Sequence, residues 1–154
     1  MKKIYKIDDL KNLKINIKIP SIIFLYGDLW AGKTTLSKHI INNLFWYTWI
    51  VTSPTYTYYN KYEVDNSLNK IKTGLLHKTQ KWQKLLTLYH FDLYRLKNYD
   101  EFFAIGWEEV FDNNTWIILV EWPEILQGYY KPDLIIKLHK TDIEDERGIE
   151  VIEN

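Results

Sequence analysis

The chain has 154 residues and no cysteine, and its 20 basic residues balance its 20 acidic ones, for a net charge of +0 at pH 7. The length predicts a single domain, residues 1–154, and the missing cysteines exclude thiol nucleophiles, iron–sulfur clusters and disulfide scaffolds. The balanced charge argues against autonomous nucleic-acid binding through a basic surface. No apolar run approaches the roughly 18 residues of a membrane span and no signal-peptide core is present, which predicts a cytoplasmic protein.

The first part of the chain predicts a strand, a helix and two further strands. The short apolar run at residues 21–26 (SIIFLY) is typical of a buried strand. After Thr34, an apolar residue recurs at every fourth position, which predicts an amphipathic helix with one buried stripe: Leu36, Ile40 and Leu44. Residues 49–51 and the Tyr- and Thr-rich residues 55–64 predict two strands.

A loop separates these elements from the second half of the chain. Residues 65–83 are polar and without a clear period, which predicts a lysine-containing loop or insertion. Residues 85–91 predict a strand that ends at Asp92, and residues 99–111 have helical spacing that is interrupted at Gly106.

Three more strands are predicted near the end of the chain. Residues 115–120 (TWIILV) have the strongest pattern of a buried strand, which ends at Glu121. Residues 133–139 and 148–152 predict two strands, and the acidic stretch 142–146 predicts the hairpin connection between them. Strands that alternate with helices indicate an α/β fold, with a mostly parallel central sheet flanked by helices and with antiparallel additions.

A phosphate-binding loop is the clearest motif in the chain. Residues 27–34 (GDLWAGKT) fit the pattern G-x-x-x-x-G-K-[ST], with an apolar strand before it and an amphipathic helix after it. The glycines let backbone N–H groups point at phosphate oxygens, Lys33 supplies positive charge to the β- and γ-phosphates, and the Thr34 hydroxyl can ligate Mg²⁺. An ordinary glycine turn before a helix is the alternative, but the flanking elements favour a P-loop NTPase-like fold.

Two carboxylates follow apolar strands, as a nucleotide site requires. Asp92 ends one strand and Glu121 ends another. In P-loop proteins such strand ends hold the metal or position the attacking water. Each carboxylate alone could be an ordinary exposed strand end, but the pair favours a role in holding the metal and positioning the water. Which of the two carboxylates has which role stays open.

The motifs together resemble the TsaE (formerly YjeE) family. The resemblance rests on GDLWAGKTT, then SPTYT at residues 53–57, YHFDLYRL at 89–96 and VEWPE at 120–124, in this order. It implies a Mg²⁺-dependent ATPase required for the tRNA modification N6-threonylcarbamoyladenosine (t6A). The implied partners are the threonylcarbamoyl transferase (TsaD-type) and its non-catalytic paralogue (TsaB-type), with tRNA reached only through that complex and no membrane involved. ATP hydrolysis, stimulated by the partners, would support or reset the transferase.

The resemblance also implies a role for individual residues. Seven consecutive residues would bind the phosphates of ATP: Leu29, Trp30, Ala31, Gly32, Lys33, Thr34 and Thr35. Thr34 and Glu121 would hold Mg²⁺. The catalytic residues would be Lys33, Asp92, Glu121 and Thr55, with Thr55 as a switch near the γ-phosphate and Asp92 orienting water or a metal-bound water.

Two features depart from the family pattern. The family usually has Gly where this chain has Trp30, and a positive φ there would be costly for Trp. The lysine-containing insertion at residues 65–84 is longer than is usual; it could touch a partner or tRNA, but a solvated loop is the simpler interpretation. Trp122 could shape the nucleotide pocket or a partner surface, or be a plain core residue.

Two other functions remain open from the residues. An ATP-binding scaffold of the same complex, with little hydrolysis because of Trp30, is the first. A small-molecule kinase is the second, but the two arginines of the chain, Arg95 and Arg147, are too few for an arginine-rich lid.

Overall fold

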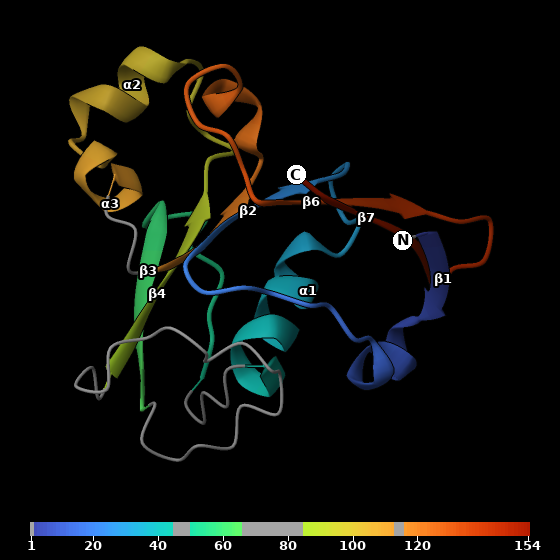
Figure 1. Ribbon diagram of the computed structural model, residues 1–154. Helices are drawn as coiled ribbons and strands as arrows, with labels where there is room; N and C mark the ends of the chain where they lie inside the picture. The colour runs from blue at the N-terminus through green and yellow to red at the C-terminus, as the bar shows by residue number, and fades with distance from the viewer. Residues whose placement is uncertain (1, 45–49, 66–84, 113–115) are drawn as a thin grey trace.

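The computed structural model describes residues 2–44, 50–65, 85–112 and 116–154, and their strands form a seven-stranded sheet of order β1-β7-β6-β2-β5-β4-β3 (Figure 1). Four neighbouring strands are parallel: β6 (Leu134–Lys140), β2 (Ser21–Tyr26), β5 (Ile117–Glu121) and β4 (Leu85–Asp92). Antiparallel strands extend this centre on both sides: β3 (Tyr59–Asp65) beside β4, and β7 (Glu146–Glu153) then β1 (Lys2–Lys6) beyond β6. The mostly parallel centre with antiparallel additions is thus confirmed.

Hydrophobic clusters cover both faces of the sheet, which is why β5 is buried along its whole length. One face packs against α1 (Lys33–His39), its π-helical continuation η2 (Ile40–Leu44) and the 3₁₀ helix η1 (Ile7–Asn12). The other packs against α2 (Tyr99–Ala104), α3 (Glu108–Asp112) and the 3₁₀ helix η4 (Pro123–Leu126). Within the described ranges, no helix has the length and apolar character that crossing a bilayer requires.

Most predicted elements are found, with small differences at their ends. The helical segment 99–111 divides around Gly106, and the acidic stretch after β6 connects it to β7 as a hairpin. The buried face of α1 is wider than one stripe, because Ser37 and His39 are buried along with Leu36 and Ile40. The side chain of Leu44 lies outside the description.

Three predictions in the loops either differ from the structure or lie outside the described residues. The strand predicted at residues 55–64 begins only at Tyr59, because residues 55–57 form a turn in which the Thr57 N–H donates to the Pro54 carbonyl over 3.1 Å. Residues 50 and 51 are not in a strand, and residues 45–49 lie outside the described residues. So do residues 66–84, almost all of the predicted insertion, and residue 115 of the strand predicted at 115–120.

The parallel strands bring their carboxyl ends to one edge of the sheet. The loop after β2 leads directly into α1, and β4 and β5 end beside it. Asp92, the last residue of β4, is the register partner of Glu121, the last residue of β5. Ligand sites of open α/β sheets lie at this edge, so the fold places the predicted loop and both predicted carboxylates together.

Candidate functional site

The loop between β2 and α1 depends on its two glycines. Gly27 has φ +147°, and a Cβ there would collide with the carbonyl oxygen of Leu138 on the neighbouring strand β6. Gly32 has φ +101° and precedes α1 directly. Both backbone conformations strain residues with a side chain. The sequence therefore folds locally into a tight loop that leads directly into α1, which is the backbone arrangement of known phosphate-binding loops.

Lys33 is the buried positive charge of the site. Its side chain is 5% exposed, and its Nζ donates to the carbonyl oxygens of Gly27 and, over 2.9 Å, Asp28. The same nitrogen lies 3.6 Å from the centre of the Trp122 ring. Burial lowers the pKa of Lys33, and Glu121 is the first of several carboxylates that oppose this shift. An ammonium held in so dry a position attracts an anion more strongly than one in water.

Glu121 is held by donors on two elements. The Thr34 hydroxyl donates to its Oε2 over 2.8 Å, and its Oε1 lies 2.7 Å from His90 Nε2 and 3.0 Å from Ser37 Oγ. Glu121 is 1% exposed, so these partners fix the orientation of its carboxylate. Hydroxyl and carboxylate oxygens are the ligands that Mg²⁺ prefers.

A chain of hydroxyl groups leads to Asp92. Asp92 Oδ1 accepts from the backbone N–H of Tyr94 over 3.1 Å, and Oδ2 accepts from the Thr55 hydroxyl. The Oγ of Ser53 lies 2.8 Å from Thr55 Oγ1. Since the single hydroxyl proton of Thr55 goes to Asp92, Ser53 is the donor in the second bond. Ser53 thus orders Thr55, and Thr55 orders Asp92.

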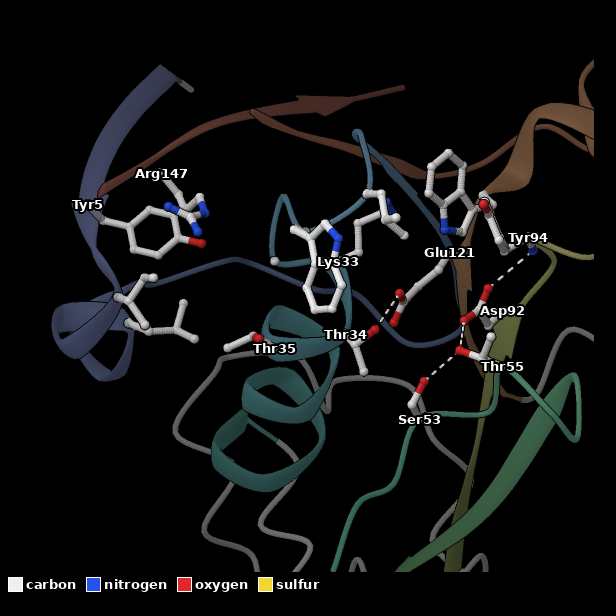
Figure 2. Close-up of a pocket in the computed structure, with 16 residues that line it drawn as sticks. Tyr5, Lys33, Thr34, Thr35, Ser53, Thr55, Asp92, Tyr94, Glu121 and Arg147 are labelled. Atoms are coloured by element: carbon white, nitrogen blue, oxygen red, sulfur yellow. Dashed lines mark hydrogen bonds between the residues drawn. The ribbon is translucent and has the colours of Figure 1, made fainter. Parts of the chain in front are cut away.

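A pocket of about 570 Å³ joins these groups. Figure 2 shows Lys33 and Thr34 in its middle, and Asp92, Thr55 and Ser53 together at one end. Nine of the ten predicted site residues line it: Leu29, Trp30, Gly32, Lys33, Thr34, Thr35, Thr55, Asp92 and Glu121. The tenth, Ala31, is fully buried in the core, and its N–H donates to the Asp28 carbonyl over 3.1 Å.

Three residues with open interpretations have clear positions. Trp30 has φ 68° and is 77% exposed, so a bulky residue occupies the left-handed conformation that favours glycine. Trp122 is half-buried, with its ring against the Lys33 ammonium and 4.9 Å from the Tyr94 ring, so it lines the pocket and is not a plain core residue. The Arg95 guanidinium lies 4.3 Å from the ring centre of the exposed Tyr56.

Sequence reasoning missed the residues that support the two carboxylates. The four histidines of the chain show no metal-ligand spacing that would mark His90 in the sequence, yet His90 lies two residues before Asp92 and so on the same face of β4. Ser37 follows Lys33 by one helical turn, and Ser53 precedes Thr55 by two residues. Periodicity could have placed His90 and Ser37 towards the site, but no pattern in the sequence shows that both meet Glu121.

Comparisons with known proteins agree on one family. The model of the family "Threonylcarbamoyl adenosine biosynthesis protein TsaE" matches residues 6–149. The tRNA threonylcarbamoyladenosine biosynthesis protein TsaE of Rickettsia felis is 33% identical over 145 residues, covering 94% of this chain and 72% of that protein. The protein of the same name from Haemophilus influenzae is 31% identical over 141 residues, covering 91% and 75%. The crystal structure of Bacillus subtilis YdiB superposes with a TM-score of 0.59 at 25% identity, covering 97% of this chain and 82% of that one.

Proposed function

Because the chain belongs to the TsaE family of threonylcarbamoyl adenosine biosynthesis proteins, we propose that it is a Mg²⁺-dependent ATPase that acts in the t6A modification of tRNA. The observation that carries the proposal is the convergence of Lys33, Thr34, Asp92 and Glu121 around one glycine-dependent loop. The ATPase would support or reset a complex of a TsaD-type transferase and a TsaB-type paralogue. Neither partner would need to supply these four side chains.

The loop and Lys33 are suited to hold the phosphates of ATP. The Nζ of Lys33 donates hydrogen bonds to carbonyl oxygens of the loop. When phosphate binds, its charged oxygens would take the place of these neutral acceptors and form stronger hydrogen bonds with Nζ. The Trp122 ring lies against the same nitrogen, which is 3.6 Å from the ring centre, and this cation–π contact helps to hold the ammonium in place. The positive charge is therefore in place before the phosphates arrive, which is how preorganised electrostatic stabilisation works.

Thr34 and Glu121 fit a Mg²⁺ ion. They present a hydroxyl and a carboxylate oxygen 2.8 Å apart at the start of α1. No group of three or more His, Cys, Asp or Glu side chains suited to a metal occurs in the described part of the chain. A Mg²⁺ ion held by one or two protein groups and by substrate phosphates does not need such a group. When bound, the ion would neutralise charge on the phosphates.

Asp92 is suited to orient the attacking water. Each of its two oxygens accepts one protein hydrogen bond, so each keeps a lone pair for water. Thr55 donates its only proton to Asp92, and would turn away from that bond if it were to donate to a γ-phosphate. Such an exchange is what a switch near the γ-phosphate requires.

The proposal is tested by phosphate release from ATP with no added acceptor. The protein is assayed with Mg²⁺, alone and with the transferase and its paralogue, and we expect release that increases when both partners are present. Binding of ATP without release would instead identify an ATP-binding scaffold. Release that needs a small-molecule acceptor would identify a kinase.

Replacing Thr55 with valine is expected to lower kcat by about tenfold or more while ATP affinity stays nearly the same. Valine keeps the shape but removes the hydroxyl that donates to Asp92 and accepts from Ser53. Steady-state phosphate release and equilibrium binding measure the two effects separately. Thr57→Val is the matched control, because the hydroxyl of Thr57 in the same turn makes long hydrogen bonds, 3.5 Å to the Pro54 carbonyl and 3.4 Å to Asn60 Oδ1. An unchanged kcat in Thr55→Val would remove Thr55 from the mechanism.

Replacing Trp30 with glycine is expected to leave turnover at saturating ATP unchanged or to raise it. Glycine adopts the φ of 68° without strain, and the side chain that is lost is 77% exposed. The melting temperature should hardly move, because relief of a left-handed conformation, worth about 1 kcal/mol, offsets the greater freedom of the unfolded chain. Turnover and thermal melting are measured side by side. A large loss of turnover without a change in melting would mean that the Trp30 side chain takes part in the reaction.

A further inference from the structure

One buried residue beside the site has no part in the proposed chemistry. His90 on β4 is 0% exposed. Its Nε2 lies 2.7 Å from Glu121 Oε1, and its Nδ1 is buried without a hydrogen-bond partner among the described residues. Burying a polar ring with one nitrogen unpaired costs free energy that an apolar side chain in the same core position would not cost. Stability alone therefore does not account for a histidine at this position.

The fold holds His90 against Glu121. In the parallel register of β4 and β5, His90 lies opposite Leu119, and Glu121 follows Leu119 by two residues. The side chains of His90 and Glu121 therefore lie on the same face of the sheet, on neighbouring strands. Both strands lie inside the sheet, between the hydrophobic clusters of its two faces. Backbone pairing and core packing thus leave the two side chains little freedom to separate.

The two oxygens of the Glu121 carboxylate have different surroundings. Oε1 has His90 Nε2 at 2.7 Å and Ser37 Oγ at 3.0 Å, and both of these side chains are fully buried. The single hydroxyl hydrogen of Ser37 can also go to the Lys33 carbonyl, which lies 3.0 Å from the same Oγ, so His90 is the firmer donor. Oε2 accepts from the Thr34 hydroxyl over 2.8 Å, and Thr34 lines the pocket (Figure 2). Oε1 thus lies towards the core, and Oε2 lies on the pocket side.

We propose that His90 is a positioning residue that occupies Oε1 of Glu121 and leaves the ion a single oxygen, Oε2, which makes the site selective for Mg²⁺ over Ca²⁺. The inference rests on the proposed function, in which Thr34 and Glu121 hold the ion. Each oxygen of a carboxylate has two lone pairs that can accept. His90 and Ser37 lie against those of Oε1, whereas Oε2 has one protein donor and keeps a lone pair free.

A carboxylate held in this way suits the smaller ion. Mg²⁺ requires near-octahedral geometry and is bound by few carboxylates together with water and phosphate oxygens, whereas Ca²⁺ takes more oxygens and often both oxygens of one carboxylate. Because the hydrogen bond from His90 occupies Oε1, Glu121 offers Ca²⁺ no second oxygen. Removing a group that orients a metal ligand typically lowers metal affinity by about 10–100-fold.

The test measures how much each ion tightens the binding of AMP-PNP, a nonhydrolysable ATP analogue, by titration calorimetry in Mg²⁺, in Ca²⁺ or in EDTA. The parent should bind AMP-PNP most tightly with Mg²⁺. His90→Leu removes the donor, and it should lower the gain in affinity from Mg²⁺ by about tenfold or more. The gain from Ca²⁺ should fall by less than about threefold, since Oε1 becomes free to bind the larger ion. Binding in EDTA should stay within about twofold, because the phosphate loop is not touched.

Further substitutions separate positioning from packing. His90→Gln restores an N–H close to the position of Nε2, and should recover the gain from Mg²⁺ to within about threefold of the parent. His39→Leu is the matched control, because His39 is a buried histidine on α1 that does not line the pocket. Its melting temperature can fall, but its preference for Mg²⁺ should equal that of the parent. Melting temperatures are recorded for all variants, and if His90→Leu does not fold, His90→Asn, whose shorter amide stands away from Oε1, takes its place with the same expectations.

The outcomes distinguish this role of His90 from the proposed function. An unchanged gain from Mg²⁺ in folded His90→Leu would overturn the positioning role and leave the phosphate site and its ion standing. Equal weakening in Mg²⁺, Ca²⁺ and EDTA would also overturn it, because His90 would then support the fold of the site and not its choice of ion. A parent that does not bind AMP-PNP, or binds it equally in all three solutions, would overturn the proposed Mg²⁺-dependent ATPase itself.

Discussion

Replacing Lys33 with alanine is expected to lower ATP turnover by about 100-fold or more, because the buried ammonium is the nearest fixed positive charge to the proposed phosphate position. The side chain is 5% exposed and faces the pocket below the Trp122 ring. Water that enters in place of the side chain carries no net charge, so it does not make up for the lost ammonium. ATP binding should weaken as well, since the same nitrogen would contact phosphate in the ground state.

The fold should survive this change. Lys33 pairs with the carbonyls of Gly27 and Asp28, and water can reach both once the side chain is cut back to a methyl group. Phosphate release, ATP binding and thermal melting are measured together. Lys38→Ala is the control, because Lys38 is an exposed lysine on the same helix. Turnover equal to the parent in Lys33→Ala would exclude the loop as the catalytic phosphate site.

The phosphate loop and the two carboxylates were predictable because they depend on local pattern and on one rule of topology. The loop fits a contiguous motif, and Asp92 and Glu121 each follow an apolar run. Parallel strands carry their carboxyl ends to one edge of the sheet, so two such residues must be neighbours when their strands pair. The register confirms this, since Asp92 lies opposite Glu121.

The pairing of Tyr5 with Arg147 could not be predicted in the same way. The strand Lys2–Lys6 is a basic edge strand with one buried residue, so its alternation is too short to stand out from a polar terminus. Its partner lies at the other end of the chain, and nothing local specifies a contact over that separation. The proximity of Tyr5 and Arg147 therefore could not be inferred from the sequence.

Residues 55–58 do not form a strand, although their strand propensity predicts one. Tyr and Thr favour strands, but the turn after Pro54 and the positive φ of Tyr58 delay β3 to Tyr59. The turn is what brings the Thr55 hydroxyl to Asp92. Tertiary contact at the site thus outweighs the local preference for a strand.

Replacing Glu121 with glutamine is expected to lower Mg²⁺-dependent hydrolysis by about 100-fold while ATP binding falls much less. The amide keeps the shape of the carboxylate but carries no charge. Its oxygen can still accept from His90 and Ser37, which leaves the nitrogen facing the Thr34 hydroxyl. Thr34 then becomes the acceptor in that bond, and the atom beside it is an NH₂ group that cannot bind a cation.

Replacing Glu121 with glutamine should destabilise the fold only slightly. Since the hydrogen bonds of Glu121 are rearranged and few are lost, the free energy of unfolding should fall by no more than about 1–3 kcal/mol. Turnover is measured across a Mg²⁺ titration, and stability is measured by urea unfolding. Glu124→Gln is the control, because Glu124 is an exposed glutamate in η4, the helix that follows β5. If Glu121→Gln and the parent respond equally to Mg²⁺, the metal is held elsewhere. Asp92, the register partner of Glu121, is then the next residue to replace, and Asp92→Asn would be expected to shift the Mg²⁺ response instead.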